Sequence, residues 1–412
     1  MGSWDCYCML CCGPLKSSSV DVGDSDAKAL RKRERSVRRM VREEKGLDGL
    51  PGGDKIEASD EDEHEAKDDD AASSLPKLSL ESVAQNELYH GNPYKGMYDY
   101  YEEYSYDPRL LTKKDVAWLD RCRTIGFNAD TKKAYITGLG TYVDWGDFET
   151  SQPGSDPNDP HPEQGRTYPC YMEDGGDIDD PTFPFHETCY AILAKRMGFD
   201  DPASITKDVL YKVASALGEG NGDSLRVDYG GEFSNQFWAN RPGEEYVVTC
   251  PEDEGLDFRN LIWKCMPPSL LLVEPQPDLS LKVQHDPLSI LPFDLLCTIL
   301  QHLSVHDTLN LMQASHHVCT TTREPTFWRS MIRTHIAPWF WETQSLVNGE
   351  TLQGFDYKGL FLWLDKITEP KLGMQGPFLG VANRRRIWSV CGLVANAYKI
   401  QLGQDQEFEA QG

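Results

Sequence analysis

Two short motifs in this sequence have residue types and spacing that suit metal binding. Cys8-Met-Leu-Cys11 places two thiols two residues apart, and His186-Glu-Thr-Cys189 repeats that spacing where a helix is expected to begin. Together they supply the Cys₃His set of a tetrahedral structural Zn²⁺, whose four protein ligands leave no open position for a catalytic water. We therefore expect one structural zinc ion that ties the N-terminal segment to a distant domain.

Other roles for these cysteines remain open at this stage. Cys6 and Cys12 flank the first motif and compete as ligands, and Cys189 can equally be a buried helix residue beside free N-terminal thiols. The chain has 12 cysteines in 412 residues, a low density for a disulfide scaffold. It shows no signal peptide and no apolar run of about 20 residues. We expect reduced thiols in an intracellular protein, cytoplasmic or nuclear, that is not bound to a membrane.

The motifs of the common enzyme classes are missing. There is no phosphate-binding glycine loop, no G-x-S-x-G elbow and no H-E-x-x-H pair. Lys and Arg number 41 against 66 Asp and Glu, so the net charge is −25, which argues against binding nucleic acid through the whole surface. We expect a non-catalytic protein with protein partners.

Around the second motif, residue periodicity predicts a mixed α/β domain over residues 89–275. We expect helices at 113–126 (with Gly126 as the C-cap), 186–197 and 206–217, and strands at 134–137, 141–143, within 225–248 and at 261–264. Residues 144–181 hold eleven carboxylates and six prolines, which indicates an acidic surface loop. That loop and the tyrosines at 98–106 either help to attract a basic target or are only solvated surface.

The composition of the N-terminal region differs from that of this domain. Residues 1–15 form a Cys-rich segment, residues 28–45 carry nine basic side chains, and residues 54–70 carry ten acidic ones. Such segments bury too little apolar surface to offset the entropy of ordering. We therefore expect a disordered basic and acidic insert over residues 16–88, with a transient helix in the basic run. That run is either a nuclear import signal or a solvated tail.

A helical segment follows a proline-rich linker. Pro292 suits the first position of a helix, and Leu295, Leu296, Ile299, Leu300 and Leu303 recur behind it at helical spacing. Ser304 to Asp307 is a capping-box-like start of a second helix. A third helical stretch carries Val318, with Trp328 beyond it. These residues predict at least a small helical core.

The order of these residues resembles the F-box family. Its pattern begins Leu-Pro-x-Glu-Leu-Leu, continues through an Asp-Leu pair and closes on Phe-Trp; here Asp294 replaces Glu, and Thr308 precedes Leu309. The resemblance implies binding to the Skp adaptor of a cullin–RING ubiquitin ligase through a helix-in-groove interface. The adaptor-binding residues that it implies are Leu291, Pro292, Leu295, Leu296, Ile299, Leu303, Leu309, Val318 and Trp328.

Motifs elsewhere in the chain are similar to those of an uncharacterised group of F-box proteins of filamentous fungi. They include Phe183-Pro-Phe-His186 and Asn383-Arg-Arg-Arg386-Ile-Trp388. The resulting expectation is a predominantly helical α+β chain, with a three-helix F-box at 286–334, a C-terminal helical region at 335–404, and the zinc-stapled α/β domain before them.

The expected function follows from this architecture. The protein would be a non-catalytic substrate receptor of an SCF ubiquitin ligase, with cullin and RING subunits reached through the adaptor and an unknown target held by the flanking regions. The alternative is a zinc-stapled interaction module whose F-box acts outside a ubiquitin ligase.

Overall fold

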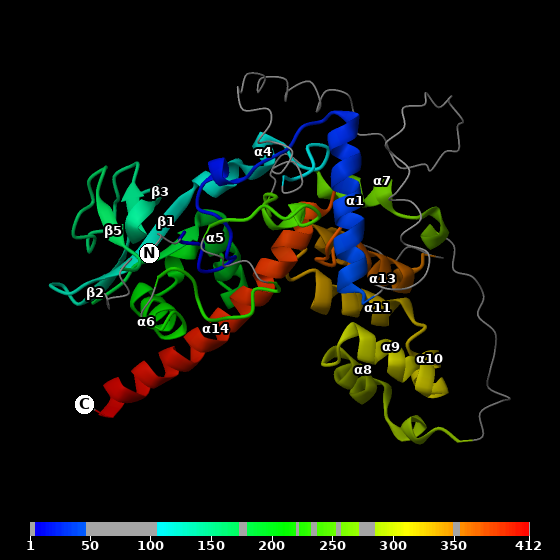
Figure 1. The fold of residues 1–412 in the computed structure, drawn as a ribbon. Coiled ribbons are helices and arrows are strands. Elements are labelled where there is room, and N and C mark those ends of the chain that lie inside the picture. Colours follow the sequence, from blue (N-terminus) through cyan, green and yellow to red (C-terminus); the bar gives the residue numbers. More distant parts are fainter. Residues whose placement is uncertain are drawn as a thin grey trace. The chain divides into compact units, whose positions relative to one another are not determined.

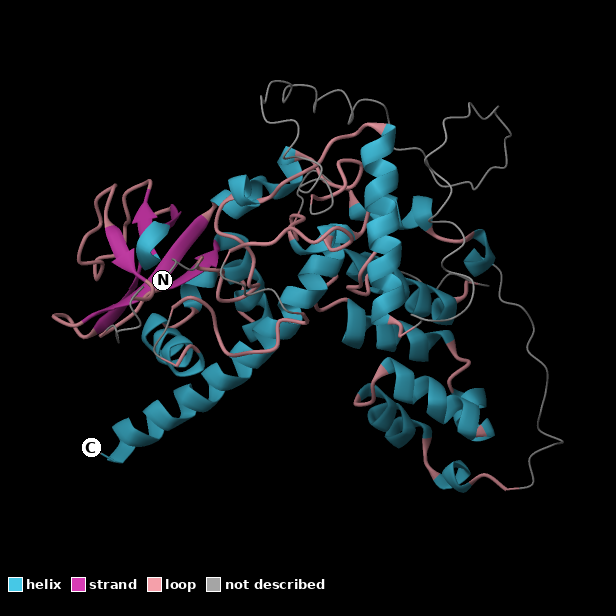
Figure 2. Cartoon of the chain, in the orientation of Figure 1, coloured by secondary structure: helices cyan, strands magenta, loops and turns pink. Residues whose placement is uncertain are grey.

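The computed structural model divides into two compact units (Figures 1 and 2). It describes residues 5–46, 105–172, 179–219, 222–231, 237–252, 257–271, 285–348 and 355–411. Unit 1 comprises residues 1–250, 370–379 and 390–412, and unit 2 comprises 251–369 and 380–389. The long helix α14 (Leu379–Gln411) therefore contributes to both units. Within the described residues, no helix is long and apolar enough to cross a bilayer.

Unit 1 is built on an antiparallel sheet with strand order β2-β1-β3-β4-β5, and β6 pairs with β1. The strands are β1 (Cys122–Asn128), β2 (Lys133–Ile136), β3 (Gly140–Val143), β4 (Asp147–Thr150), β5 (Thr167–Pro169) and β6 (Phe183–His186). Helices α5 (Glu187–Met197) and α6 (Lys207–Leu217) follow β6. The expected strands at 134–137 and 141–143 and both of these helices are confirmed.

The expected helix at 113–126 is wrong in its second half. Helix α4 (Lys113–Val116), which Thr112 and Asp115 cap, continues as a 3₁₀ turn to Asp120, and β1 begins at Cys122. Gly126 lies inside β1, where a Cβ atom would meet the Tyr135 ring at 2.6 Å. Glycine is therefore needed there for close packing between two strands and not for a helix end.

Part of the expected disordered insert is folded. Residues 16–46 contain a 3₁₀ turn at Ser17–Ser19 and α1 (Ala27–Glu44), whose N-cap Asp26 accepts hydrogen bonds from two backbone amides. Arg33 of α1 is buried and donates to Ser105 Oγ at 3.1 Å. These contacts join residues far apart in sequence, so the local composition does not predict them. Residues 47–104, which hold the acidic run and most tyrosines of the aromatic segment, lie outside the described residues.

The acidic segment 144–181 is not simply a loop, because β4 and β5 lie within it. The expected strands within 225–248 are also wrong: the described residues there form loops and a 3₁₀ turn at Glu245–Val247. Likewise, the expected strand at 261–264 is part of helix α7 (Phe258–Cys265). Short apolar runs of this kind have no periodicity that separates a strand from a helix.

Unit 2 is helical (Figure 1). After α7 it contains 3₁₀ turns at Pro268–Leu271, Pro287–Ile290 and Trp341–Thr343, helices α8 (Phe293–Gln301), α9 (Val305–Ala314), α10 (His316–Thr321), α11 (Pro325–Met331), α12 (Gln344–Asn348) and α13 (Tyr357–Ile367), and a π-helical turn at Ile332–Ile336. The expected helices between residues 292 and 334 are confirmed.

Residues 380–389 of α14 complete unit 2 through a buried arginine. Arg384 pairs with the Glu342 carboxylate at 2.8 Å, donates to the Pro251 carbonyl at 2.7 Å and lies 3.8 Å from the Trp341 ring centroid. Unit 2 therefore combines the helices after residue 285 with residues 251–271, which the sequence had assigned to the preceding domain.

Candidate functional site

The four residues of the two metal-binding motifs come together in unit 1. The ligand atoms of Cys8, Cys11, His186 and Cys189 all lie within 4.8 Å of one another, and all four residues are buried. His186 Nδ1 is 3.4 Å from Cys11 Sγ and 3.8 Å from Cys189 Sγ. Tetrahedral Zn²⁺ with Zn–S of about 2.3 Å and Zn–N of about 2.0 Å separates a sulfur from a nitrogen by about 3.5 Å. This Cys₃His cluster therefore has the dimensions of a zinc site.

A tight turn shapes the first half of the cluster. The Cys8 amide donates to the Gly13 carbonyl at 3.0 Å and the Cys12 amide donates to the Cys8 carbonyl at 2.7 Å, while Cys12 adopts a positive φ of 53°. The Gly13 amide then points at Cys11 Sγ from 3.3 Å. This contact helps to hold the Cys11 sulfur in its position beside His186 Nδ1.

The junction of β6 and α5 shapes the second half. His186 ends β6, and Cys189 lies in the first turn of α5, where the helix dipole favours a negative charge. His186 Nε2 lies 3.0 Å from the Pro14 carbonyl. Since a carbonyl only accepts, this contact places a ring hydrogen on Nε2, and in the neutral imidazole the Nδ1 lone pair then faces the sulfurs.

The charges within the cluster favour a cation. Burial opposes ionisation of Cys8, but hydrogen bonds from the Cys11 and Cys189 thiols and the charge of His186 hold the pKa of the Cys8 thiol well below its usual range. Burial raises the pKa of Cys189 well above its usual range. Burial opposes protonation of His186, but its interactions with the neighbouring cysteines raise the pKa of its imidazole well above the usual range. A divalent cation would take the place of the protons on these sulfurs and stabilise them as thiolates.

Neighbouring residues close the site. The Trp118 ring centroid lies 4.5 Å from that of His186, and Cys122 Sγ donates to the Leu119 carbonyl at 3.0 Å. Cys6 and Cys12 are buried but do not belong to the cluster, which is the one group of potential metal ligands found among the described residues.

A second candidate site lies on α8 in unit 2. Leu295 and Ile299 are 55% and 43% exposed, whereas Leu296 and Leu300 are at most 1% exposed. The helix thus has an inner apolar face that fills the core and an outer apolar face that meets solvent. With the exposed Pro292 at its N-cap, the outer face comprises residues three and four apart.

The other adaptor residues that the resemblance implies differ in exposure. Leu291, Leu303 and Leu309 are half-buried. Val318 and Trp328 are fully buried, and Trp328 Nε1 donates to the Thr322 carbonyl at 2.6 Å, so these two side chains belong to the helical core together with Leu296.

Two exposed residues beside Pro292 were missed from the sequence. Ile290 is 84% exposed and Phe293 is 43% exposed. The signal was present, because the run from Leu288 to Leu296 has more apolar side chains than one helix face can bury. Phe293 is the first residue of α8 and Ile290 ends the 3₁₀ turn before it, so both extend the exposed apolar surface at the start of α8.

Side-chain caps hold these helices in place. Ser304 Oγ accepts the Asp307 amide hydrogen at 3.1 Å, as expected for the start of α9. Asp286 accepts hydrogen bonds at 2.8 Å from the Ser315 hydroxyl and the His317 amide, and these contacts lower the pKa of Asp286. Asp286 therefore fastens the segment before α8 to the start of α10.

The comparisons with known proteins bear on this helical segment alone. Residues 288–330 match the family model of the F-box domain, which covers helices α8 to α10 and most of α11. No curated protein and no solved structure matches the chain significantly.

Proposed function

Because the chain is an F-box protein by its domain at residues 288–330, we propose that it is a substrate receptor of an SCF-type ubiquitin ligase. The observation that carries this proposal is the outer face of α8. An F-box helix with exposed apolar side chains over a filled core suits insertion into the groove of a Skp-type adaptor. Burial of Leu295 and Ile299 at that interface would remove from water an apolar surface that the monomer leaves exposed.

In this role the protein brings a target close to the ubiquitin ligase and does not catalyse a reaction itself. The F-box joins the chain to the adaptor and through it to the cullin and RING subunits. The other regions hold a target protein so that its lysines meet the charged ubiquitin carrier at a raised effective concentration. The receptor itself has no catalytic residues in this proposal.

The test is adaptor capture by a double variant, Leu295→Ala with Ile299→Ala. Each truncation removes an anchor that is already solvent-exposed, so the fold keeps its core and the loss falls on binding, at about 2 kcal/mol or more for each anchor. We expect the purified adaptor to be lost in a pull-down.

The matched control is Leu393→Ala with Ile400→Ala on α14, where the two side chains are 46% and 65% exposed. This variant loses the same two side-chain types from another helix and should capture the adaptor normally. Wild-type recovery with the α8 variant would contradict the proposal.

We also propose that the Cys₃His cluster binds one structural zinc ion. Cys8, Cys11, Cys189 and the Nδ1 atom of His186 are its ligands, and the Pro14 carbonyl orients the imidazole. In this site zinc joins the N-terminal turn to the junction of β6 and α5. The support is the agreement of ligand types, spacing and distances with tetrahedral coordination.

A second candidate function is a zinc-stapled interaction module whose F-box acts outside a ubiquitin ligase. The observation that favours it is the metal-type cluster in a unit separate from the F-box. Probing the captured adaptor for cullin separates the two. Recovery of cullin with the protein supports the receptor, and adaptor without cullin supports the module.

A further inference from the structure

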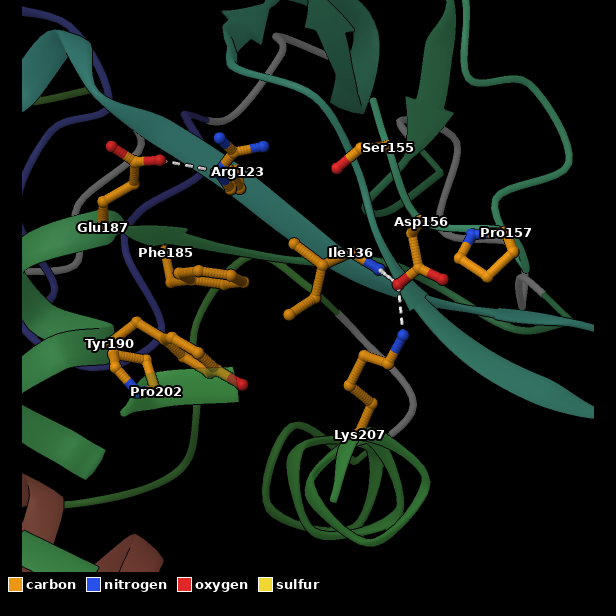
Figure 3. Close-up of a pocket in the computed structure, with 10 residues that line it drawn as sticks. All are labelled: Arg123, Ile136, Ser155, Asp156, Pro157, Phe185, Glu187, Tyr190, Pro202 and Lys207. Carbon is orange, nitrogen blue, oxygen red and sulfur yellow. Dashed lines mark hydrogen bonds and ion pairs between the residues drawn. The ribbon is translucent and has the colours of Figure 1, made fainter. Parts of the chain in front are cut away.

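A pocket of about 420 Å³ lies in unit 1 outside the metal cluster (Figure 3). Strands β1, β2 and β6, the loop between β4 and β5, helices α5 and α6 and the turn between these helices form its wall. The lining residues are Arg123, Ile136, Ser155, Asp156, Pro157, Phe185, Glu187, Tyr190, Pro202 and Lys207. Its size and its mixture of apolar and polar side chains are those of a ligand-binding cleft.

The charged groups of the wall are balanced in two ion pairs. Glu187 accepts from Arg123 Nε at 2.7 Å and is shared with Arg121 at 2.7 Å, and Asp156 pairs with Lys207. Two cations and two carboxylates therefore line the pocket, and Arg121, which does not line it, shares Glu187. The wall thus lacks the negative excess of a chain whose net charge is −25, and an anionic group meets no net repulsion from it.

The guanidinium of Arg123 is held in place and still has N–H groups that no described residue engages. Its Nε donates to Glu187 and its Nη1 to the Thr137 carbonyl at 2.8 Å. Among the described residues, no partner engages Nη2, so two N–H groups of a fixed guanidinium remain for a ligand. Ser155 lines the same pocket (Figure 3), and its hydroxyl has no hydrogen-bond partner among the described residues either.

The remaining wall is apolar. The rings of Phe185 and Tyr190 stack with centroids 4.8 Å apart, and Ile136 and Pro202 lie close by in Figure 3. At the rim, Ser155 and Pro157 are exposed to solvent. A side chain can enter here while the rest of its own chain passes outside.

We propose that this pocket binds a segment of the target protein through a glutamate or aspartate side chain next to an apolar residue. The carboxylate bonds to Arg123 Nη2 and Ser155 Oγ, and the apolar side chain packs on Ile136, Tyr190 and Pro202. The inference rests on the proposed function, since it names the chemistry by which the receptor would recognise its target.

The pocket also has a link to the metal cluster. Phe185 and Glu187 line the pocket, and His186 between them faces the sulfurs. Metal bound at His186 would hold this stretch of backbone rigid, and a rigid wall lowers the entropy cost of binding a peptide.

The test uses two short capped peptides, acetyl-Gly-Leu-Glu-Gly-amide and its glutamine counterpart, titrated into the full-length protein by ligand-observed NMR. The peptides differ only in the carboxylate. We expect the glutamate peptide to bind about tenfold more tightly, which is the effect of a charge-assisted hydrogen bond to Arg123. Equal binding of the two peptides, or binding of neither, overturns the proposal.

Variants test whether the preference for the glutamate peptide depends on the pocket. Arg123→Gln should remove it, Arg123→Lys should keep part of it because the charge remains, and the control Lys133→Gln, an exposed lysine paired with Asp208, should leave it unchanged. A preference that survives Arg123→Gln overturns the proposal. Thermal unfolding of each variant confirms that it is folded, and Arg123→Lys supplies the comparison if Arg123→Gln does not fold.

The peptide assay and the adaptor pull-down test the two proposals separately. The α8 double variant should bind the glutamate peptide as the wild type does, and Arg123→Gln should capture the adaptor normally. If the protein prefers the glutamate peptide but does not capture the adaptor, the proposed function is rejected and the proposal for the pocket stands. If it captures the adaptor but shows no preference between the peptides, only the proposal for the pocket is rejected.

Discussion

The Cys₃His cluster in unit 1 is sealed from solvent, whereas the outer face of α8 in unit 2 is open to it. In both places the side chains are unfavourable in free energy. The cluster buries thiols that can ionise, and the helix exposes leucine and isoleucine to water. The two proposals give each of them a partner. A small cation would satisfy the cluster from within, and another protein would cover the helix from outside.

This difference predicts different consequences of mutation. Changes in the cluster should reduce stability first, because its residues join distant parts of one unit. Changes on the outer face of α8 should reduce binding and leave the stability of the chain nearly intact.

The largest expected effect is loss of the metal. Metal analysis of protein purified without chelator should find close to one zinc per chain, and Cys8→Ser or His186→Ala should each release it. Structural zinc contributes on the order of 10 kcal/mol to folding, so the melting temperature should fall clearly in both variants. Cys6→Ser is the matched control, since Cys6 is equally buried but outside the cluster, and it should retain the zinc. Protein without zinc would reject the site.

A smaller effect separates the two faces of α8. Leu296→Ala leaves a cavity beneath the helix and should destabilise unit 2 by about 2–5 kcal/mol. Leu295→Ala, one residue away and 55% exposed, should change stability by less than about 1 kcal/mol. Chemical denaturation of both variants measures the difference. Equal losses of stability would mean that the two faces are not distinct.

The smallest effect concerns the anchor of the segment before α8. Because the pKa of Asp286 is lower in the folded protein than in the unfolded chain, its ionised form stabilises the fold above the unfolded pKa of about 3.9. That contribution is lost as the pH falls through the lower folded pKa. The melting temperatures of wild type and Asp286→Asn should therefore differ slightly at pH 6 and converge near pH 3. A difference that persists at pH 3 would contradict this role.

Several elements were predictable because their signals are local. The helices around α8 have apolar residues at helical spacing, a proline at the start and a serine cap, and all of these agree. The grouping of Cys8, Cys11, His186 and Cys189 was predictable because C-x-x-C and H-x-x-C spacings constrain the side chains that can share one metal.

Other elements were not predictable because they depend on distant contacts. Helix α1 has a composition typical of a solvated segment, yet the Arg33–Ser105 hydrogen bond links it to a residue that follows an insert. Gly126 looked like a helix end, but it pairs with Tyr135 of β2 and therefore lies in a strand. In both cases tertiary packing outweighs local preference.

By itself, the sequence determined the type of chemistry in this protein: an F-box helix pattern in one region and a Cys₃His ligand set in another. Only the tertiary structure decided which apolar residues of α8 face solvent, and that the two halves of the cluster meet. The physical reason is that spacing constrains neighbours on one helix or turn, whereas exposure and long-range contact depend on how the elements pack. The pocket around Arg123 illustrates this most clearly, since its walls come from strands, helices and loops that have no shared motif.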